Sequence, residues 1–181
     1  VDSEAVKLHS SAGANGDLFI DANTNGVAAV GGSLSIIATT GNITQSLPVT
    51  VGTTSSFTTS INNTTITLSN TSNAFAGLVT LSTTGTTAHV IIDNGTTTLG
   101  IDTSTVGGNL TLTSGAAEGI IDSDNVTVTG NLIATTNANS GVINMDTLRV
   151  DGTVALTTHG DGDATIVNDD EIDFANSTVR G

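Results

Sequence analysis

The chain has 181 residues, no cysteine, no tryptophan, no tyrosine and a formal net charge of −14. Only Lys7, Arg149 and Arg180 are basic, which argues against binding to nucleic acid or to an anionic membrane surface, because both need clustered Lys and Arg. The absence of cysteine excludes disulfides and thiolate metal sites.

Short apolar alternations recur along the chain and predict β-strands, because alternation points the aliphatic side chains inward and Thr, Ser or charged side chains outward. In chain order these alternations are Leu34–Ile36, Val49–Val51, Ile66–Leu68, Leu99–Ile101, Leu110–Leu112, Val126–Val128, Leu148–Val150, Val154–Leu156 and Ile172–Phe174. The runs His89–Ile92 and Gly119–Asp122 are expected to be strands that contain a corner. No window has the spacing of an amphipathic helix, and Thr, Val and Gly are poor helix formers.

Two adjacent segments of 22 residues, Gly108–Thr129 and Gly130–Asp151, repeat the same pattern. Their alignment places Leu110 on Leu132, Ile120 on Val142, Val126 on Leu148 and Val128 on Val150. An internal repeat of this period is typical of a stacked solenoid. Three alternations per segment predict one turn of a β-helix per segment, with Gly and Asn at corners that need a positive φ angle.

The rest of the chain divides into further segments of this kind, of 20 to 31 residues, and into a longer repeat. The other segments are Gly32–Val51, Gly52–Ala76, Gly77–Gly107 and Gly152–Arg180. A longer third segment ends on Val-Gly-Gly or Val-Arg-Gly in each long repeat, at spacings of 76 and 73 residues. We therefore predict one domain over residues 1–181, made of a partial repeat 1–31 and two repeats, 32–107 and 108–181, within a longer repetitive rod.

The expected fold is all-β: a single-stranded, right-handed parallel β-helix, or β-solenoid, of about seven coils with three short strands per coil. Parallel stacking should form an inner ladder of Leu110, Leu132 and Val154 and an outer ladder of Thr113, Thr135 and Thr157. An antiparallel sandwich is the alternative; it would show Asn-Gly hairpin signals at regular short spacing.

Several stretches resemble the repeats of large exported bacterial proteins of the filamentous-haemagglutinin type, from two-partner secretion and autotransporter systems. These stretches are GNITQSLPVTVG, TTITLSNTSNAFAGLVTLS and TTTLGIDTSTVGGNLTLT. The resemblance implies a right-handed β-helical shaft, export to the bacterial cell surface or the medium, and a role in adhesion or filament building.

The predicted function is structural: the shaft of a secreted or cell-surface adhesin or extracellular filament. Its expected partners are further repeats of the same chain or further copies, by end-to-end or lateral association. The alternative is an extracellular module that recognises a host glycan or receptor through the longer third-coil loops. No membrane insertion is expected.

The stretch HGDGDATIVNDDEIDF concentrates acids, and Asp161 and Asp163 are the best pair for Ca²⁺, which prefers closely spaced oxygen ligands. A solvated corner of the third segment explains the same residues. Stacking could also bring Asp122 and Asp124 near Asp146. His9 and His159 occupy nearly equivalent places, which common repeat ancestry explains. No other cofactor is expected.

An enzyme is not expected. Polysaccharide-degrading β-helices need a base and aromatic platforms for sugar rings, and this chain has three basic residues and neither Trp nor Tyr. Ice binding needs Thr pairs in register, whereas Thr111 should face Ile133 and Ala155. An ice-binding β-helix and a polysaccharide-degrading β-helix are therefore weaker alternatives than the structural shaft.

Overall fold

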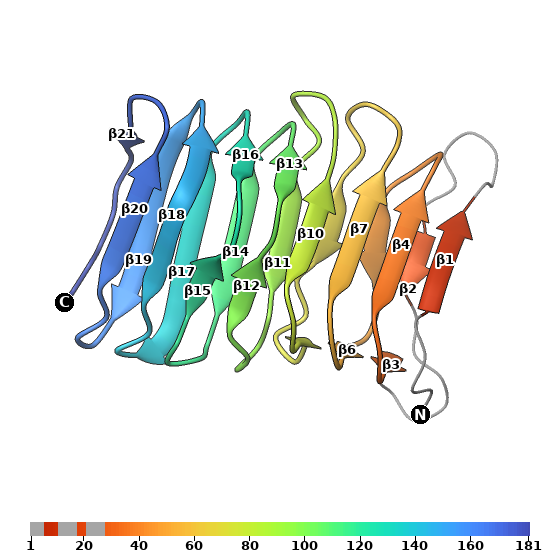
Figure 1. The fold of residues 1–181 in the computed structure, drawn as a ribbon, viewed down its shortest axis with the longest axis horizontal. Helices are drawn as coiled ribbons and strands as arrows, with labels where there is room; N and C mark the ends of the chain where they lie inside the picture. Colours follow the sequence, from red (N-terminus) through yellow and green to blue (C-terminus); the bar gives the residue numbers. More distant parts are fainter. Residues whose placement is uncertain (1–5, 11–17, 21–27) are drawn as a thin grey trace.

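Parallel stacking of short strands organises the whole chain. The computed structural model describes residues 6–10, 18–20 and 28–181, with side chains from residue 29 onward. These residues form an all-β parallel β-solenoid of about seven turns with three strands per coil and no helix, which confirms the predicted fold class. Its turns follow one another along the long axis, from β1 at one end to β20 at the other (Figure 1). The hand of the coil stays a prediction.

The strands form three sheets, here called A, B and C. Sheet A contains β1 (Val6–Ser10), β4 (Leu34–Ala38), β7 (Ser55–Thr59), β10 (Val79–Ser82), β12 (Leu99–Ile101), β13 (Ser104–Val106), β15 (Ile120–Asp122), β16 (Val126–Val128), β18 (Ile143–Val150) and β20 (Ala164–Asn168). Sheet B contains β2 (Leu18–Ile20), β5 (Ile43–Gln45), β8 (Ile66–Leu68), β11 (Val90–Asp93), β14 (Leu110–Ser114), β17 (Leu132–Asn139), β19 (Thr153–His159) and β21 (Asp173–Phe174). Sheet C contains β3 (Ala28–Val30), β6 (Val49–Val51) and β9 (Ala74–Phe75).

The register of sheet B confirms both predicted ladders. Leu110 pairs with Leu132, which pairs with Val154, and all three are fully buried. Thr113 pairs with Thr135 and Thr135 with Thr157 on the outer face. In sheet A, Val126 pairs with Leu148 and Val128 with Val150, as the alignment of the two 22-residue segments predicts.

Two details of the predicted stacking are wrong. Ile120 pairs with Ile143 rather than with Val142, because the turn before β18 shifts the register by one residue. The segment Gly77–Gly107 is more than one turn: β12 and β13, near its end, both pair with β10, near its start. The turn after β11 returns the chain to sheet A, so the next coil begins inside this segment.

The cross-section of the solenoid changes along the rod. The first three coils place one strand in each sheet, and sheet C ends at β9. In later coils two strands lie in sheet A, separated by a short bend, as in β12 with β13 and β15 with β16. The bend disappears in β18, which pairs with both β15 and β16.

Columns of aliphatic side chains fill the interior. One column runs through six consecutive strands of sheet B, and every member is 0% exposed: Ile43, Ile66, Val90, Leu110, Leu132 and Val154. The three-sided coils also hold Phe57 and Phe75, whose rings meet edge to face at 5.7 Å. Each buried aliphatic side chain contributes roughly 1.5–3 kcal/mol relative to full exposure.

The Gly-Asn corners explain the repeated Gly-Asn-Leu motif. The Asn109 side-chain oxygen accepts a hydrogen bond from the backbone N–H of Asn131, and Asn131 does the same for Thr153, at 3.0 and 2.9 Å. Gly130 stacks on Gly108, whose carbonyl oxygen a Cβ atom at position 130 would approach to 2.7 Å. The expected positive φ is wrong here; Gly85, Gly95, Gly119 and Gly160 have it, in other turns. Close approach of backbones requires glycine at position 130.

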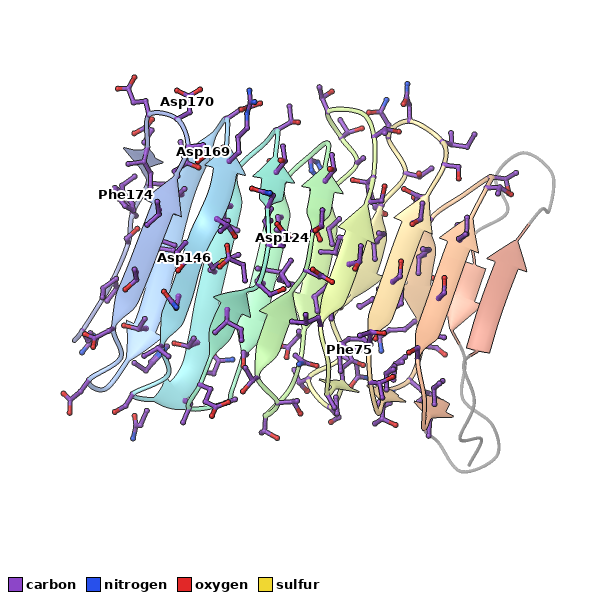
Figure 2. The ribbon with its side chains drawn as sticks, viewed as in Figure 1. Phe75, Asp124, Asp146, Asp169, Asp170 and Phe174 are labelled. Atoms are coloured by element: carbon purple, nitrogen blue, oxygen red, sulfur yellow. The ribbon has the colours of Figure 1, made fainter. Side chains whose placement is uncertain are left out.

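The last described coil leaves part of the core uncovered. Phe174 pairs with Val154 and so belongs to the inner column of sheet B, yet it is 54% exposed. It lies near Asp169 and Asp170 at the C-terminal end of the rod (Figure 2).

The described residues include no helix of the length and apolarity that a membrane span requires.

Candidate functional surfaces

The bend in sheet A gathers carboxylates on the outer surface. Asp122 accepts hydrogen bonds from the backbone N–H groups of Asp146 and Thr147, at 2.9 and 3.0 Å, and from the Thr147 hydroxyl at 2.9 Å. Asp124 lies in the same bend (Figure 2) and accepts a hydrogen bond from the Thr103 hydroxyl one coil below, at 3.0 Å. The structure thus brings Asp122 and Asp124 near Asp146, and the carboxylates of Asp122 and Asp124 join the bend to the coils on its two sides.

Two carboxyl groups on the surface have shifted pKa values of opposite sign. Hydrogen bonds from the Asn125 backbone N–H and then from the Thr103 hydroxyl hold the pKa of Asp124 below its usual range. Burial raises the pKa of Asp93, and the backbone N–H of Gly95 opposes that rise only in part. Asp124 is therefore stabilised in its ionised form, whereas Asp93 is not.

The acid-rich stretch near the C-terminus does not form one cluster. Asp161 and Asp163 are exposed in the turn before β20, whereas Asp169, Asp170 and Glu171 follow this strand at the opposite edge of the solenoid. A five-residue strand spans about 16 Å, so the two groups are separate. Among the described residues, no three His, Asp or Glu side chains form a group that could hold a metal ion. Ca²⁺ binding by Asp161 and Asp163 stays a prediction.

The described histidines join neighbouring coils. His89 Nδ1 accepts a hydrogen bond from the backbone N–H of Asn109 at 2.9 Å. His159 Nδ1 lies 2.8 Å from the carbonyl oxygen of Thr136, to which it can donate. The side chain of His9 lies outside the described residues. These contacts give His89 and His159 a structural part in stacking.

Buried amides, which the sequence pattern did not predict, satisfy the backbone where sheet C ends. The Asn94 side chain accepts from the N–H of Phe75 at 2.7 Å and donates to the carbonyl oxygens of Phe75 and Thr98 at 3.1 and 2.8 Å. Asn73 makes a similar set of bonds with Gln45, Val49, Leu68 and Asp93. A buried amide needs such partners, but its sequence context of Asn, Thr and Ser gave no signal of burial.

A shallow groove of about 320 Å³ opens on the outer face of sheet A, where the cross-section changes. Its lining residues are Ala76, Gly77, Leu78, Thr98, Gly100, Glu118 and Ile121. Leu78 and Ile121 are half-buried, and Glu118 is exposed at the rim. The signal in the sequence was Gly100, the one glycine within a strand of the described part of the chain, since glycine inside a strand often marks a close approach.

Comparisons with known proteins connect part of the chain to a repeat family. The profile of a family described as "Repeats of unknown function (DUF5649)" matches residues 11–82, which is less than half of the chain. No curated protein and no solved structure gave a match. The matched segment includes β2 to β10, so these repeats, whose function is unknown, form coils of the β-solenoid described above.

Proposed function

We propose that the chain is a structural shaft: a stiff rod segment of a bacterial adhesin or extracellular filament, exported to the cell surface or the medium. The observation that carries this proposal is the unbroken inner column of sheet B, from Ile43 to Val154, in which every side chain is fully buried. Each coil shares its core and its parallel hydrogen-bond ladder with the next, so bending the rod would break many contacts together.

The exposed Phe174 supports growth of the rod by further coils. From Ile43 to Val154 each residue of this column is fully buried, whereas Phe174 is 54% exposed. A further coil of the same type would bury it and pair with the free edges of β20 and β21. The coil would come from further repeats or from a second copy by end-to-end association, and lateral association of rods is the other expected contact.

The surface chemistry supports a scaffold. With a net charge of −14 and Thr, Ser and Asn on most outer strand positions, the chain stays soluble and resists non-specific binding. The resemblance to filamentous-haemagglutinin-like repeats supports export and adhesion. The proposal includes no catalytic activity.

Electron microscopy and analytical ultracentrifugation of the purified 181-residue chain test this function. We expect rods whose length increases with protein concentration. Phe174→Ser should shorten them, because it removes the apolar surface that a further coil would bury. Ile133→Ser is the matched control: Ile133 is 42% exposed on the outer face of sheet B, so its loss should leave rod length unchanged and can reduce only lateral bundling.

Other outcomes would contradict the shaft. Monomers at all concentrations, with binding to specific glycans on an array, would favour the alternative of a recognition module. Antibodies against the chain should label intact cells of the producing bacterium; labelling only after permeabilisation would contradict export.

A further inference from the structure

The groove on sheet A lies where one outward position lacks a side chain. Leu78, Gly100 and Ile121 are neighbours in one outer column, since Val79 pairs with Ile101 and Gly100 with Ile121. A Cβ atom at position 100 would lie 2.8 Å from Leu78 Cδ2 and 3.7 Å from Ile121 Cγ1. Gly100 is not among the residues with positive φ, so backbone conformation does not require glycine here. Gly100 itself is buried because the Leu78 side chain leans over it, and Leu78 and Ile121 together form an aliphatic floor.

The rim of this groove carries the carboxylate of Glu118, which has no cationic partner among the described residues. The Thr98 hydroxyl donates to Glu118 Oε2 at 3.2 Å, which leaves Oε1 available to a ligand. The one ion pair in the described part of the chain joins Arg149 and Asp151, at 3.5 Å. The Thr98 carbonyl is held by Asn94 at 2.8 Å, so the backbone beneath this rim is fixed.

Size and charge together define what the groove fits. Its volume of about 320 Å³ lies at the lower end of the range of about 300–1,000 Å³ for small-molecule sites, which suits one extended side chain. The floor is aliphatic, the rim is negative, and the chain carries a net charge of −14. An apolar stem that ends in a positive charge is complementary to all three features.

We propose that this groove binds a lysine side chain of a partner polypeptide, with the methylene stem lying across Leu78 and Ile121 and the ammonium group on Glu118. Lysine fits better than arginine because an ammonium group needs one carboxylate oxygen, whereas guanidinium binds best to both. Lysine also lays its stem along apolar surface while its charge stays in water. The site does not depend on the shaft function, so each can fail without the other.

Two-dimensional ¹⁵N NMR of the intact chain tests the site, with N-acetyl-lysine-N′-methylamide as the probe. Its uncharged counterpart with the same stem, N-acetyl-norleucine-N′-methylamide, and the arginine analogue are the comparators. We expect weak, saturable binding of the lysine probe, with shift changes confined to the amides of Thr98, Gly100, Glu118 and Ile121. The norleucine and arginine probes should bind more weakly.

Variants separate the charge of the groove from its floor. Glu118→Gln should weaken lysine binding roughly fivefold, the upper value for an exposed ion pair, and Glu171→Gln, an exposed acid elsewhere, should not change it. Gly100→Ala should weaken binding roughly fourfold, because the added methyl group would displace the Leu78 side chain from the floor of the groove. Equal binding of lysine and norleucine, equal binding of lysine and arginine, shifts spread over many acidic residues, or unchanged binding by the Glu118→Gln chain would each overturn the proposal.

Discussion

Single polar side chains hold successive coils together where the sheets alone do not. Asn94 is fully buried and satisfies three backbone groups on Phe75 and Thr98. Alanine cannot replace these bonds, and an unsatisfied buried group costs about 1–3 kcal/mol. Because Asn94 lies where sheet C ends, its bonds connect the coils with one strand in each sheet to the coils with two strands in sheet A. This connection is here called the joint.

Asn94→Ala should therefore lower the free energy of unfolding by about 1–3 kcal/mol. The measurement is a guanidinium chloride unfolding curve, compared with that of the unmodified chain. Asn144→Ala is the control, because Asn144 is exposed on β18 and surface substitutions usually stay within about 0.5 kcal/mol. Equal effects of the two substitutions would show that the Asn94 bonds do not hold the joint.

The two shifted carboxyl groups should act on stability with opposite signs. The pKa of Asp124 is lowered, so its contribution is favourable above the unfolded-state pKa of about 3.9 and is lost as pH falls through the folded-state pKa. The pKa of Asp93 is raised, so its ionised form is unfavourable at neutral pH, and this penalty is relieved as pH falls through the raised folded-state pKa.

Thermal unfolding from pH 7 to pH 2 checks these signs. At pH 7 Asp124→Asn should lower Tm and Asp93→Asn should raise it or leave it unchanged. Both differences should shrink towards acid pH, where each carboxyl is protonated in the folded and unfolded chain. Shifts of the same sign for both variants at pH 7 would contradict the assignment.

At the scale of the element, the corner decides which residue types a coil tolerates. Gly130 meets the backbone of Gly108, which cannot move without disturbing the coil below, whereas Gly100 meets the flexible end of Leu78. Gly130→Ala should therefore cost about 1–3 kcal/mol, as overpacking does, and Gly100→Ala should cost less. Urea unfolding of the two variants makes this comparison, and a larger loss for Gly100→Ala would refute the close-approach argument.

Apolar alternation in the sequence does not predict a strand where polar side chains point inward. The strand β7 gives no apolar alternation in the sequence, because its inward positions Ser55, Phe57 and Thr59 include two polar residues. Its pairing with β4 and β10 forms it nevertheless. In a solenoid, neighbouring coils can impose a strand on a segment of weak local preference.

At the scale of the whole molecule, charge opposes the association that the exposed core favours. Asp169 and Asp170 are exposed near Phe174 at the end of the rod (Figure 2), and a second copy of the chain would also be acidic. Salt screens such repulsion, with a Debye length of about 30 Å at 0.01 M and about 8 Å at 0.15 M. Raising NaCl across this range should therefore lengthen the rods.

Sedimentation velocity at fixed protein concentration measures this effect. An equal osmotic strength of sucrose, which screens no charge, is the control. Rods that shorten with salt would indicate that association depends on attraction between charges rather than on the apolar end of the core.

The sequence by itself determined the class of this fold, because in parallel stacking each residue lies on its equivalent one coil below. The equal segments that begin at Gly108 and Gly130 therefore predicted the Leu110–Leu132–Val154 ladder correctly. Only the tertiary structure decided where a coil turns, since a corner can absorb a variable number of residues. The segment Gly77–Gly107 thus proved longer than one turn. Because the corners could not be placed from the sequence, the strand β20, which separates the acids on its two sides, was not predicted. The groove at Gly100 likewise arises from neighbours about 20 residues apart, whose pairing depends on every corner between them.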